Sequence, residues 1–310
     1  MKKFNDLLEE WLNYMQMQVK QSTYACYARL ISTHIAPYFD GMNVNEINQT
    51  VLTQFISGKL ENGRVDGRGG LSEKTVKDIM SILNSTLKYA EIVHGVKKPA
   101  FLKWRYSNLN KPIEILTEKE QEILENYLME DMDMAKFGVL ICLYSGMRLG
   151  EICALRWEDI DLGQGIFHIR RAMQRIYLPN NPKHTKMIID LPKTQASIRD
   201  IPIASVLSEY LSGYYQQVEN PESYFISCRG DKFLDPRTYQ AKFKIYLENS
   251  GLRYRNFHSL RHTFATRCIE KGMDVKSLSE ILGHSNVTVT LNRYVHSSME
   301  LKRSQLEKLC

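Results

Sequence analysis

The N-terminal part of the chain carries an apolar pattern that predicts helices only. Apolar residues recur at helical spacing over Phe4–Met15, and a second such stretch follows Ser22, which we expect to be its N-cap. A third stretch spans residues 51–60, and a longer one begins at Ser72. The pattern therefore predicts a small helical domain over residues 1–96.

From residue 113 onward the apolar period changes along the chain. Helical spacing gives way to alternation between Gly165 and Ile203, which is typical of strands. We expect the last two strands to turn through the segment LPKTQAS. Helical spacing returns at residues 205–215 and 236–248. The predicted fold is mainly α with a small β-sheet, in which the helical domain precedes a mixed α/β domain over residues 113–310.

One predicted helix near the C-terminus places charged groups where packing residues are expected. In the helix that begins near His258, Arg261 falls in the middle of the apolar stripe and His258 lies inside its edge. Arginine is seldom fully buried unless it is paired, and an unpaired buried charge is costly. We therefore expect an anionic partner for Arg261, and a structural carboxylate is the ordinary interpretation.

The residues after this helix add further reactive groups. Asp274 is suited to cap a short helix that ends at Gly283, and His284 stands just past that end. A last apolar stripe consists of Val287, Leu291, Tyr294 and Val295. Together with the preceding helix, this stretch supplies an arginine, two histidines and a tyrosine.

The ordered set HSLRH, LGHS and Tyr294 resembles the C-terminal signature of the tyrosine recombinases, the integrase family. In that family an H-x-x-R helix, a following histidine or tryptophan, and a nucleophilic tyrosine occur in this order. Each motif alone is weak, whereas the ordered set is specific. The resemblance implies the two-domain fold of that family and predicts further motifs upstream.

Two upstream segments match these expectations. In SGMRLGEICALRW, Arg148 falls in the first turn of a helix, where a cation is unfavourable unless an anion binds there. This segment resembles the family's first-arginine box, with Glu151 as its supporting acidic residue. The segment LPKTQASIRDIP resembles the family's β-hairpin, and the resemblance assigns its active-site lysine to Lys193; without that context, Lys193 is interpreted as a solvated turn residue.

The resemblance implies transesterification at a DNA phosphodiester. Tyr294 would attack phosphorus, form a 3′-phosphotyrosyl link and release a 5′-hydroxyl, so that religation needs no ATP. The catalytic residues implied are Arg148, Lys193, His258, Arg261, His284 and Tyr294.

The other catalytic residues receive distinct roles. Arg148 and Arg261 would clamp the two non-bridging oxygens, because planar guanidiniums suit phosphate geometry. Lys193 would protonate the leaving 5′ oxygen, His258 would assist proton transfer at the tyrosine, and His284 would hydrogen-bond the phosphate. Since these cations neutralise the charge, no metal and no cofactor are expected, and no carboxylate cluster suits Mg²⁺.

Composition adds limited constraints. The chain of 310 residues has a net charge of +6, which is compatible with a nucleic-acid partner. No apolar run approaches the roughly 18 residues of a membrane span, and the N-terminus does not resemble a signal peptide. The six cysteines lack metal-binding spacing. A reduced, cytoplasmic protein without a membrane partner is the simplest interpretation.

The segment between the two predicted domains, residues 97–112, is basic. It has no acidic residue from Lys97 to Lys111, and aromatic residues interleave its positive charges. One interpretation is an ordinary solvated linker; the other is a strap along a phosphate backbone. The DNA-binding candidates are Lys97, Lys98, Lys103, Arg105 and Lys111.

The expected function is site-specific recombination that integrates or excises a mobile element. The expected partners are double-stranded DNA core sites, further copies of the chain in a tetramer on DNA, and an accessory directionality factor. Alternatives are a Xer-type chromosome resolvase, a type IB topoisomerase and a DNA-binding protein with an inactive site. The amphipathic tail, residues 297–310, either docks on a neighbouring protomer or folds back on its own domain.

Overall fold

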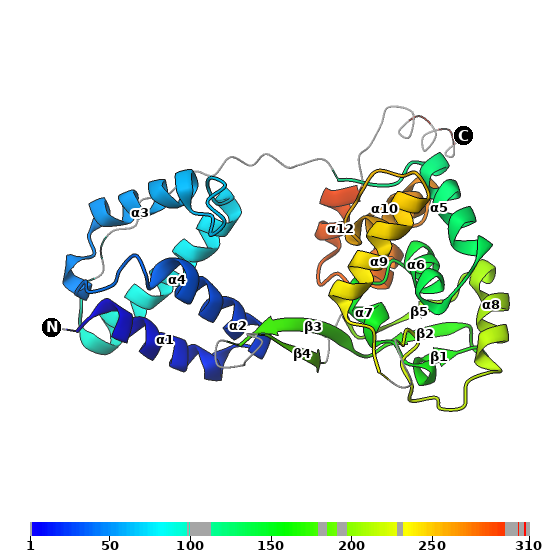
Figure 1. The fold of residues 1–310 in the computed structure, drawn as a ribbon, viewed down its shortest axis with the longest axis horizontal. Helices are drawn as coiled ribbons and strands as arrows, with labels where there is room; N and C mark the ends of the chain where they lie inside the picture. Colours follow the sequence, from blue (N-terminus) through cyan, green and yellow to red (C-terminus); the bar gives the residue numbers. More distant parts are fainter. Residues whose placement is uncertain are drawn as a thin grey trace. The chain divides into compact units, whose positions relative to one another are not determined.

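A computed structural model gives the fold of the chain (Figure 1). It describes residues 2–97, 99, 113–178, 185–190, 197–227, 232–294, 303 and 307. The chain divides into two compact units, one formed by residues 1–111 with 175–186 and the other by residues 112–174 with 187–310.

The first unit is built from helices around an aromatic core. The rings of Phe4 and Phe55 each lie 5.1 Å from that of Phe39, and all three side chains are fully buried. Its helices are α1 (Phe4–Gln18), α2 (Gln21–Leu30), the π-helix η1 (Ile31–Ile35), the 3-10 helix η2 (Val44–Glu46), α3 (Gln49–Asn62) and α4 (Glu73–His94).

Two helix starts predicted in this unit have different outcomes. The hydroxyl of Ser72 accepts a hydrogen bond from the backbone N–H of Thr75 at 3.2 Å, so its assignment as the N-cap of α4 is confirmed. The assignment of Ser22 was wrong, because α2 already begins at Gln21 with Lys20 as its N-cap residue. Ser22 therefore lies inside the first turn of α2.

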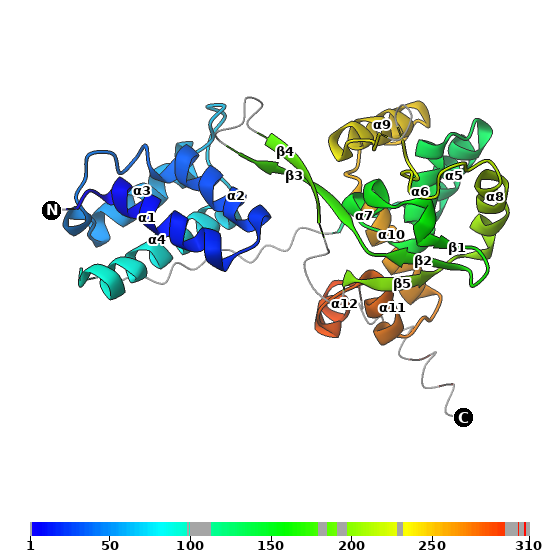
Figure 2. The same cartoon turned by 90° about the horizontal axis from the view of Figure 1, so that it is seen from below.

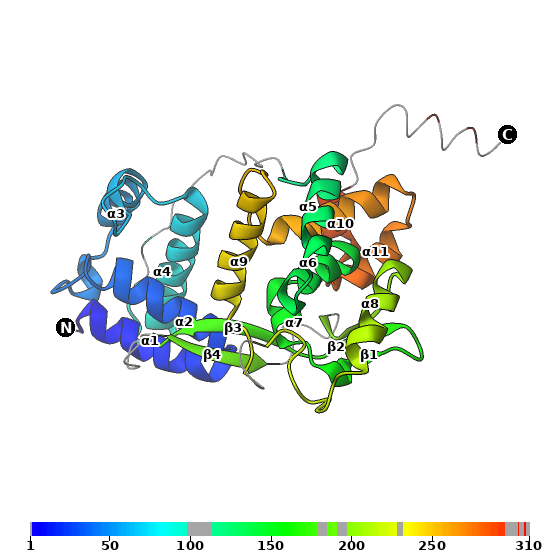
Figure 3. The same cartoon turned by 45° about the vertical axis from the view of Figure 1, so that its right-hand side comes forward.

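The second unit combines helices with a small sheet. Its helices are α5 (Glu118–Glu130), α6 (Met134–Ser145), α7 (Leu149–Ala154), η3 (Trp157–Asp159), α8 (Ser205–Tyr215), α9 (Pro236–Asn249), α10 (His258–Glu270), α11 (Val275–Leu282) and α12 (Val287–Tyr294). In Figure 3, α10 lies against α6, and it also packs on α11 and α12. The N-terminus of α10 is fixed by Phe257, whose ring packs on Tyr239 and Phe243.

The strands form two sheets. In the first, β1 (Ile160–Asp161), β2 (Ile166–Ile169) and β5 (Arg199–Pro202) lie in the order β1-β2-β5 and are antiparallel (Figure 2). The second pairs β3 (Ala172–Tyr177) with β4 (Thr185–Asp190). The strands on either side of LPKTQAS therefore do not pair with each other as predicted, since β4 pairs with β3 and β5 with β2.

A glycine makes the turn that joins α6 to α7. Gly146 has a φ of +64°, which favours glycine over residues with a Cβ atom. A Cβ there would also lie 2.5 Å from the ring of Phe264 and 2.9 Å from Leu282. The turn between α6 and α7 consequently packs directly against α10 and α11, and Arg148 follows it by two residues.

Candidate active site

Three arginines converge on the C-terminal end of α11. Backbone carbonyls there have no partner within the helix and form the negative end of its dipole. The carbonyl of Ile281 accepts from Arg199 Nε at 2.5 Å, and that of Leu282 accepts from Arg261 Nη2 at 2.6 Å. The next carbonyl, of Gly283, accepts from Arg148 Nη2 at 3.1 Å. One helix end therefore fixes guanidiniums from α10, β5 and the turn before α7.

A buried carboxylate links two of these arginines. Glu151 is 3% exposed, and its two oxygens receive Arg199 Nη1 and Nη2, each at 2.9 Å. Arg148 Nη1 donates to the same carboxylate at 2.6 Å. Burial alone would raise the pKa of the Glu151 carboxyl, but the hydrogen bonds and charge of Arg199, aided by Arg148, lower it to about 2. Glu151 is thus ionised and orients Arg148.

The partners of Arg261 differ from the carboxylate that was expected. Its guanidinium is 2% exposed, and its hydrogen bonds in the described part of the chain go to the carbonyls of Gly146, at 2.8 Å, and Leu282. Burial and the nearby charge of Arg148 lower the pKa of Arg261 to about 9, so the group stays charged at neutral pH. Carbonyl dipoles hold this cation in place without cancelling its charge, which leaves it able to bind an anion.

Two histidines of α10 lie one turn apart. His258 begins the helix and is exposed, whereas His262 is 7% exposed, and their rings meet edge-on at 4.5 Å. Although part of His258 is exposed, the side of its ring that packs on His262 is desolvated, and this desolvation together with the charge of Arg261 lowers its pKa to about 4. Burial and the neighbouring His258 lower the pKa of His262 to about 3. Both rings are therefore neutral at physiological pH.

The phenol of Tyr294 is held against His262. Tyr294 ends α12 and is 6% exposed, and its Oη lies 2.7 Å from His262 Nδ1. Burial raises the pKa of Tyr294, although the charges of Arg261, Arg293 and Arg148 oppose that rise. Three positive groups of the site consequently favour the ionised phenol.

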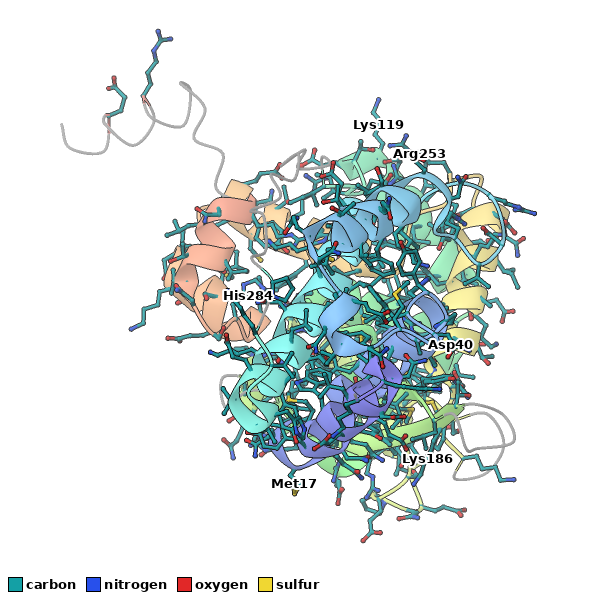
Figure 4. The ribbon with its side chains drawn as sticks, turned by 90° about the vertical axis from the view of Figure 1, so that its left-hand side faces the viewer. Met17, Asp40, Lys119, Lys186, Arg253 and His284 are labelled. Carbon is teal, nitrogen blue, oxygen red and sulfur yellow. The ribbon has the colours of Figure 1, made fainter. Side chains whose placement is uncertain are left out.

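His284 is held in a similar way by α12. This residue, labelled in Figure 4, follows Gly283, the C-cap residue of α11, and its Nδ1 lies 2.7 Å from Thr290 Oγ1. Burial and the charge of Arg261 lower its pKa to about 4. Thr290 is fully buried one turn before Tyr294, whereas Leu291 is 41% exposed. The prediction of an apolar buried face for α12 was therefore wrong in part. The side chains buried on this helix are those of Thr290 and Tyr294, which form hydrogen bonds to histidines.

The structure brings together five of the six predicted catalytic residues in one unit: Arg148, His258, Arg261, His284 and Tyr294. Lys193 lies outside the described residues, as do Lys98, Lys103, Arg105 and Lys111 of the basic segment and most of the tail. Lys97 is described and exposed. Over the described residues, no three or more histidine, cysteine or acidic side chains group as metal ligands, and no helix is both long and apolar enough to cross a membrane.

Three residues that hold the predicted ones were not themselves predicted: Arg199, His262 and Thr290. Each carries a signal in the pattern. In β5, buried and exposed residues alternate, and Arg199 lies on the buried side together with Ile201. A partner for its charge was therefore to be expected. His262 lies four residues after His258 and Thr290 four before Tyr294, which places each pair on one helix face.

The neutral imidazoles predict a pH-dependent stability. An unfolded histidine takes up its proton near pH ~6.5, whereas the folded pKa is about 4 for His258 and for His284. Their contribution is complete above about pH 6.5 and is lost as pH falls toward 4. When the pH is lowered from neutral to about 5, the melting temperature should therefore fall less in the double variant His258→Gln, His284→Gln than in the wild type. Calorimetry measures this fall. Equal losses would contradict these pKa values.

Comparisons with known proteins agree with this geometry. The model of the "Phage integrase family" matches residues 114–300, and that of the "Phage integrase, N-terminal SAM-like domain" matches residues 3–60. A tyrosine recombinase XerC-like protein of Caldanaerobacter subterraneus subsp. tengcongensis is 27% identical over 98% of this chain and 82% of its own length. The ICEBs1 integrase of Bacillus subtilis is 24% identical over 99% of this chain and 82% of its own.

Solved structures give the same fold. The Tn1549 transposon integrase in complex with transposon right end DNA superposes with a TM-score of 0.78 at 20% identity, covering 98% of each chain. A lambda integrase tetramer bound to a Holliday junction gives 0.66 at 16% identity, covering 97% of this chain and 81% of the other. The predicted fold class is confirmed. Because the family model also covers more than half of the sequence, the chain belongs to the phage integrase family of tyrosine recombinases.

Proposed function

We propose that this chain is a site-specific DNA recombinase that cuts and rejoins strands through Tyr294. The observation that carries the proposal is the convergence of one buried phenol with two fixed guanidiniums, those of Arg148 and Arg261, whose charges both act on it. A nucleophile and a pair of anion-binding groups in one place are what phosphoryl transfer requires. Trapping a covalent protein–DNA adduct and mapping it to Tyr294 tests the proposal.

The step is a transesterification. Tyr294 Oη forms a bond to phosphorus, the P–O5′ bond breaks, and the 3′-phosphate stays attached to the protein. His258, which is neutral because of its low pKa, takes the phenolic proton. Lys193 delivers a proton to the departing O5′. Arg148 and Arg261 carry the charge on the non-bridging oxygens, with His284 as a further hydrogen-bond donor to the phosphate.

The rest of the chain delivers DNA to this site. We assign core-site binding to the helical domain, residues 1–96, catalysis to residues 113–310, and phosphate binding to the basic segment that joins these domains in the sequence. Recombination joins two duplexes, each cut at two positions, so the active form is a tetramer on DNA. An accessory directionality factor is a further proposed partner.

The substrate is proposed to be the ends of a mobile element. The similarity to the ICEBs1 integrase over 99% of this chain, and to the fold of a transposon integrase, supports this assignment. The XerC-like relative supports a chromosome resolvase as the second candidate. Sequencing the DNA covalently attached to Tyr294 distinguishes the two. Recombination between two marked sites excludes a topoisomerase and an inactive DNA-binding protein.

Replacing the nucleophile should separate binding from chemistry. Tyr294→Phe removes only the phenolic oxygen and keeps the ring in its buried place. We expect no strand cleavage and no covalent adduct, with DNA affinity unchanged in gel-shift titration. Cleavage at the wild-type rate would remove Tyr294 from this role.

Each guanidinium should contribute strongly to cleavage. Arg148→Ala and Arg261→Ala are each expected to lower the single-turnover rate by roughly 100-fold or more, as for the loss of one preorganised donor. Arg148→Lys is the matched control: it keeps a charge but loses the fork that binds Glu151 and Gly283 together, so it should recover only part of the rate. Full activity in a folded Ala variant would make the arginines purely structural.

The role of Lys193 predicts a rescue by the substrate. Lys193→Ala should slow cleavage of normal DNA by roughly 100-fold or more, within the usual range for general acid catalysis. A substrate with sulfur in place of the bridging 5′ oxygen has a leaving group that needs no proton. On that substrate Lys193→Ala should cleave as fast as the wild type, while Arg261→Ala should remain slow. Failure of the rescue would show that Lys193 does not protonate the leaving group.

Phosphate binding by the basic segment predicts a change in salt dependence. Replacing Lys97, Lys98 and Lys103 with Ala should weaken binding to all sequences alike. It should also flatten the slope of log affinity against log salt by about 0.9 for each phosphate that is no longer neutralised. The control is Lys271→Ala. Lys271 follows the C-terminal end of α10, whereas His258 begins that helix. An unchanged slope in the triple variant would identify the segment as a solvated linker.

A further inference from the structure

The imidazole of His262 touches the proposed nucleophile but takes no part in the proton transfers of the proposed step. Its two nitrogens have different neighbours: Nδ1 lies 2.7 Å from Tyr294 Oη, and Nε2 lies 3.3 Å from Arg293 Nη2. The ring is buried, and His262 lies within α10, so that helical residues precede and follow it. The two neighbours are adjacent residues of α12.

The neighbours decide which nitrogen carries the proton. A guanidinium has only donors, so Arg293 can hydrogen-bond to Nε2 only when Nε2 has a free lone pair. A neutral imidazole without a proton on Nε2 has it on Nδ1. Neutrality follows from burial and from the surrounding positive charge, which lower the pKa of His262 to about 3. The Nδ1–H then points at the oxygen of Tyr294, which accepts it.

We propose that His262 is a catalytic hydrogen-bond donor to Tyr294, whose Nδ1–H stabilises the ionised phenol and whose tautomer Arg293 sets. This inference rests on the proposed function of Tyr294 as the nucleophile. A donor aimed at the phenolic oxygen favours the phenolate over the phenol, and it leaves the phenolic proton free to depart to His258. His262 itself neither gains nor loses a proton during the attack.

The arrangement offsets an electrostatic difficulty of the site. Burial of Tyr294 in an apolar cluster with Ala265, Leu278 and Leu282 disfavours its anion. The charged groups that act on the phenol are Arg261 of α10, Arg293 of α12 and Arg148 before α7. These guanidiniums donate to backbone carbonyls, to the Glu151 carboxylate and to His262. They therefore act on the phenol through space, whereas His262 touches the reacting oxygen.

Amide substitutions test the donor directly. In His262→Asn the side-chain nitrogen can take the place of Nδ1 and donate to the phenol, whereas in His262→Gln the amide reaches the place of Nε2 instead. The measurement is the single-turnover rate of adduct formation as a function of pH. DNA affinity and melting temperature are recorded for each variant.

We expect His262→Ala and His262→Gln to cleave on the order of 10- to 100-fold more slowly, the value of a hydrogen bond to a charged group. Because the lost donor stabilised the phenolate, the rise of rate with pH should move to higher pH in both. His262→Asn should restore most of the rate and the wild-type pH profile. Arg293→Met should shift the profile in the same direction. Combined with His262→Ala it should add a smaller shift than it causes alone, because only its through-space charge on the phenol is then lost.

The outcomes that overturn the inference are distinct from those that overturn the function. If the wild type forms no adduct at Tyr294, the proposed function fails and the role of His262 fails with it. If the wild type forms the adduct and folded His262→Ala matches its rate and profile, only the role of His262 is wrong. If folded His262→Asn is as slow as His262→Ala, a donor at the place of Nδ1 does not assist the reaction and the donor assignment is wrong.

Discussion

The candidate active site depends on the interaction of three guanidiniums with the last carbonyls of α11. Arg148, Arg199 and Arg261 come from a turn, a strand and a helix that are far apart in sequence, and one short helix end fixes them all. Free carbonyls at the negative end of a helix are suited to hold cations. They do so without supplying a full negative charge, so the cations keep their attraction for a phosphate.

Glu151 supplies the negative charge that stabilises such a cationic cluster. It is buried between Arg148 and Arg199, and removing one partner from a buried ion pair typically costs about 3–5 kcal/mol. One carboxylate cannot compensate three guanidiniums, and the excess positive charge helps to lower the pKa of nearby His258, His262 and His284. Their neutrality follows in part from the same field that prepares the site for an anion.

Much of the fold is legible in the sequence because its signals are local. The ends of α8 and the start of α9 follow from hydrophobic spacing, and the N-cap residue Ser72 marks the start of α4. The pairing of the strands on either side of LPKTQAS was predicted wrongly because strand pairing is not local: β5 pairs with β2 and β4 with β3. A strand can form its backbone hydrogen bonds with any neighbouring strand, and the alternation of apolar and polar residues does not show which strand that is.

The candidate site was predicted as a set of residues but not as a set of interactions. The carbonyl partners of Arg261 lie 115 and 21 residues away in the sequence. Because every residue has a backbone carbonyl, the pattern of side chains does not show which carbonyls bind the guanidinium. The buried face of α12 was likewise misjudged, because Thr290 and Tyr294 are buried through hydrogen bonds to histidines of other elements. The positions of apolar residues alone do not predict the burial of such polar side chains.

The composition of α12 has a consequence for how Tyr294, the proposed nucleophile, is positioned. An eight-residue helix is not stable by itself, and α12 leaves Val289 and Leu291 exposed while burying little besides Thr290 and Tyr294. Each hydrogen bond that holds it contributes about 1 kcal/mol. The position of α12 therefore depends on few interactions with the rest of the unit, and a change of ~1.4 kcal/mol in their free energy would change the ratio of docked to undocked helix tenfold. A partner that binds the docked helix more tightly than the free one would raise the fraction of molecules in which the Tyr294 phenol lies against His262.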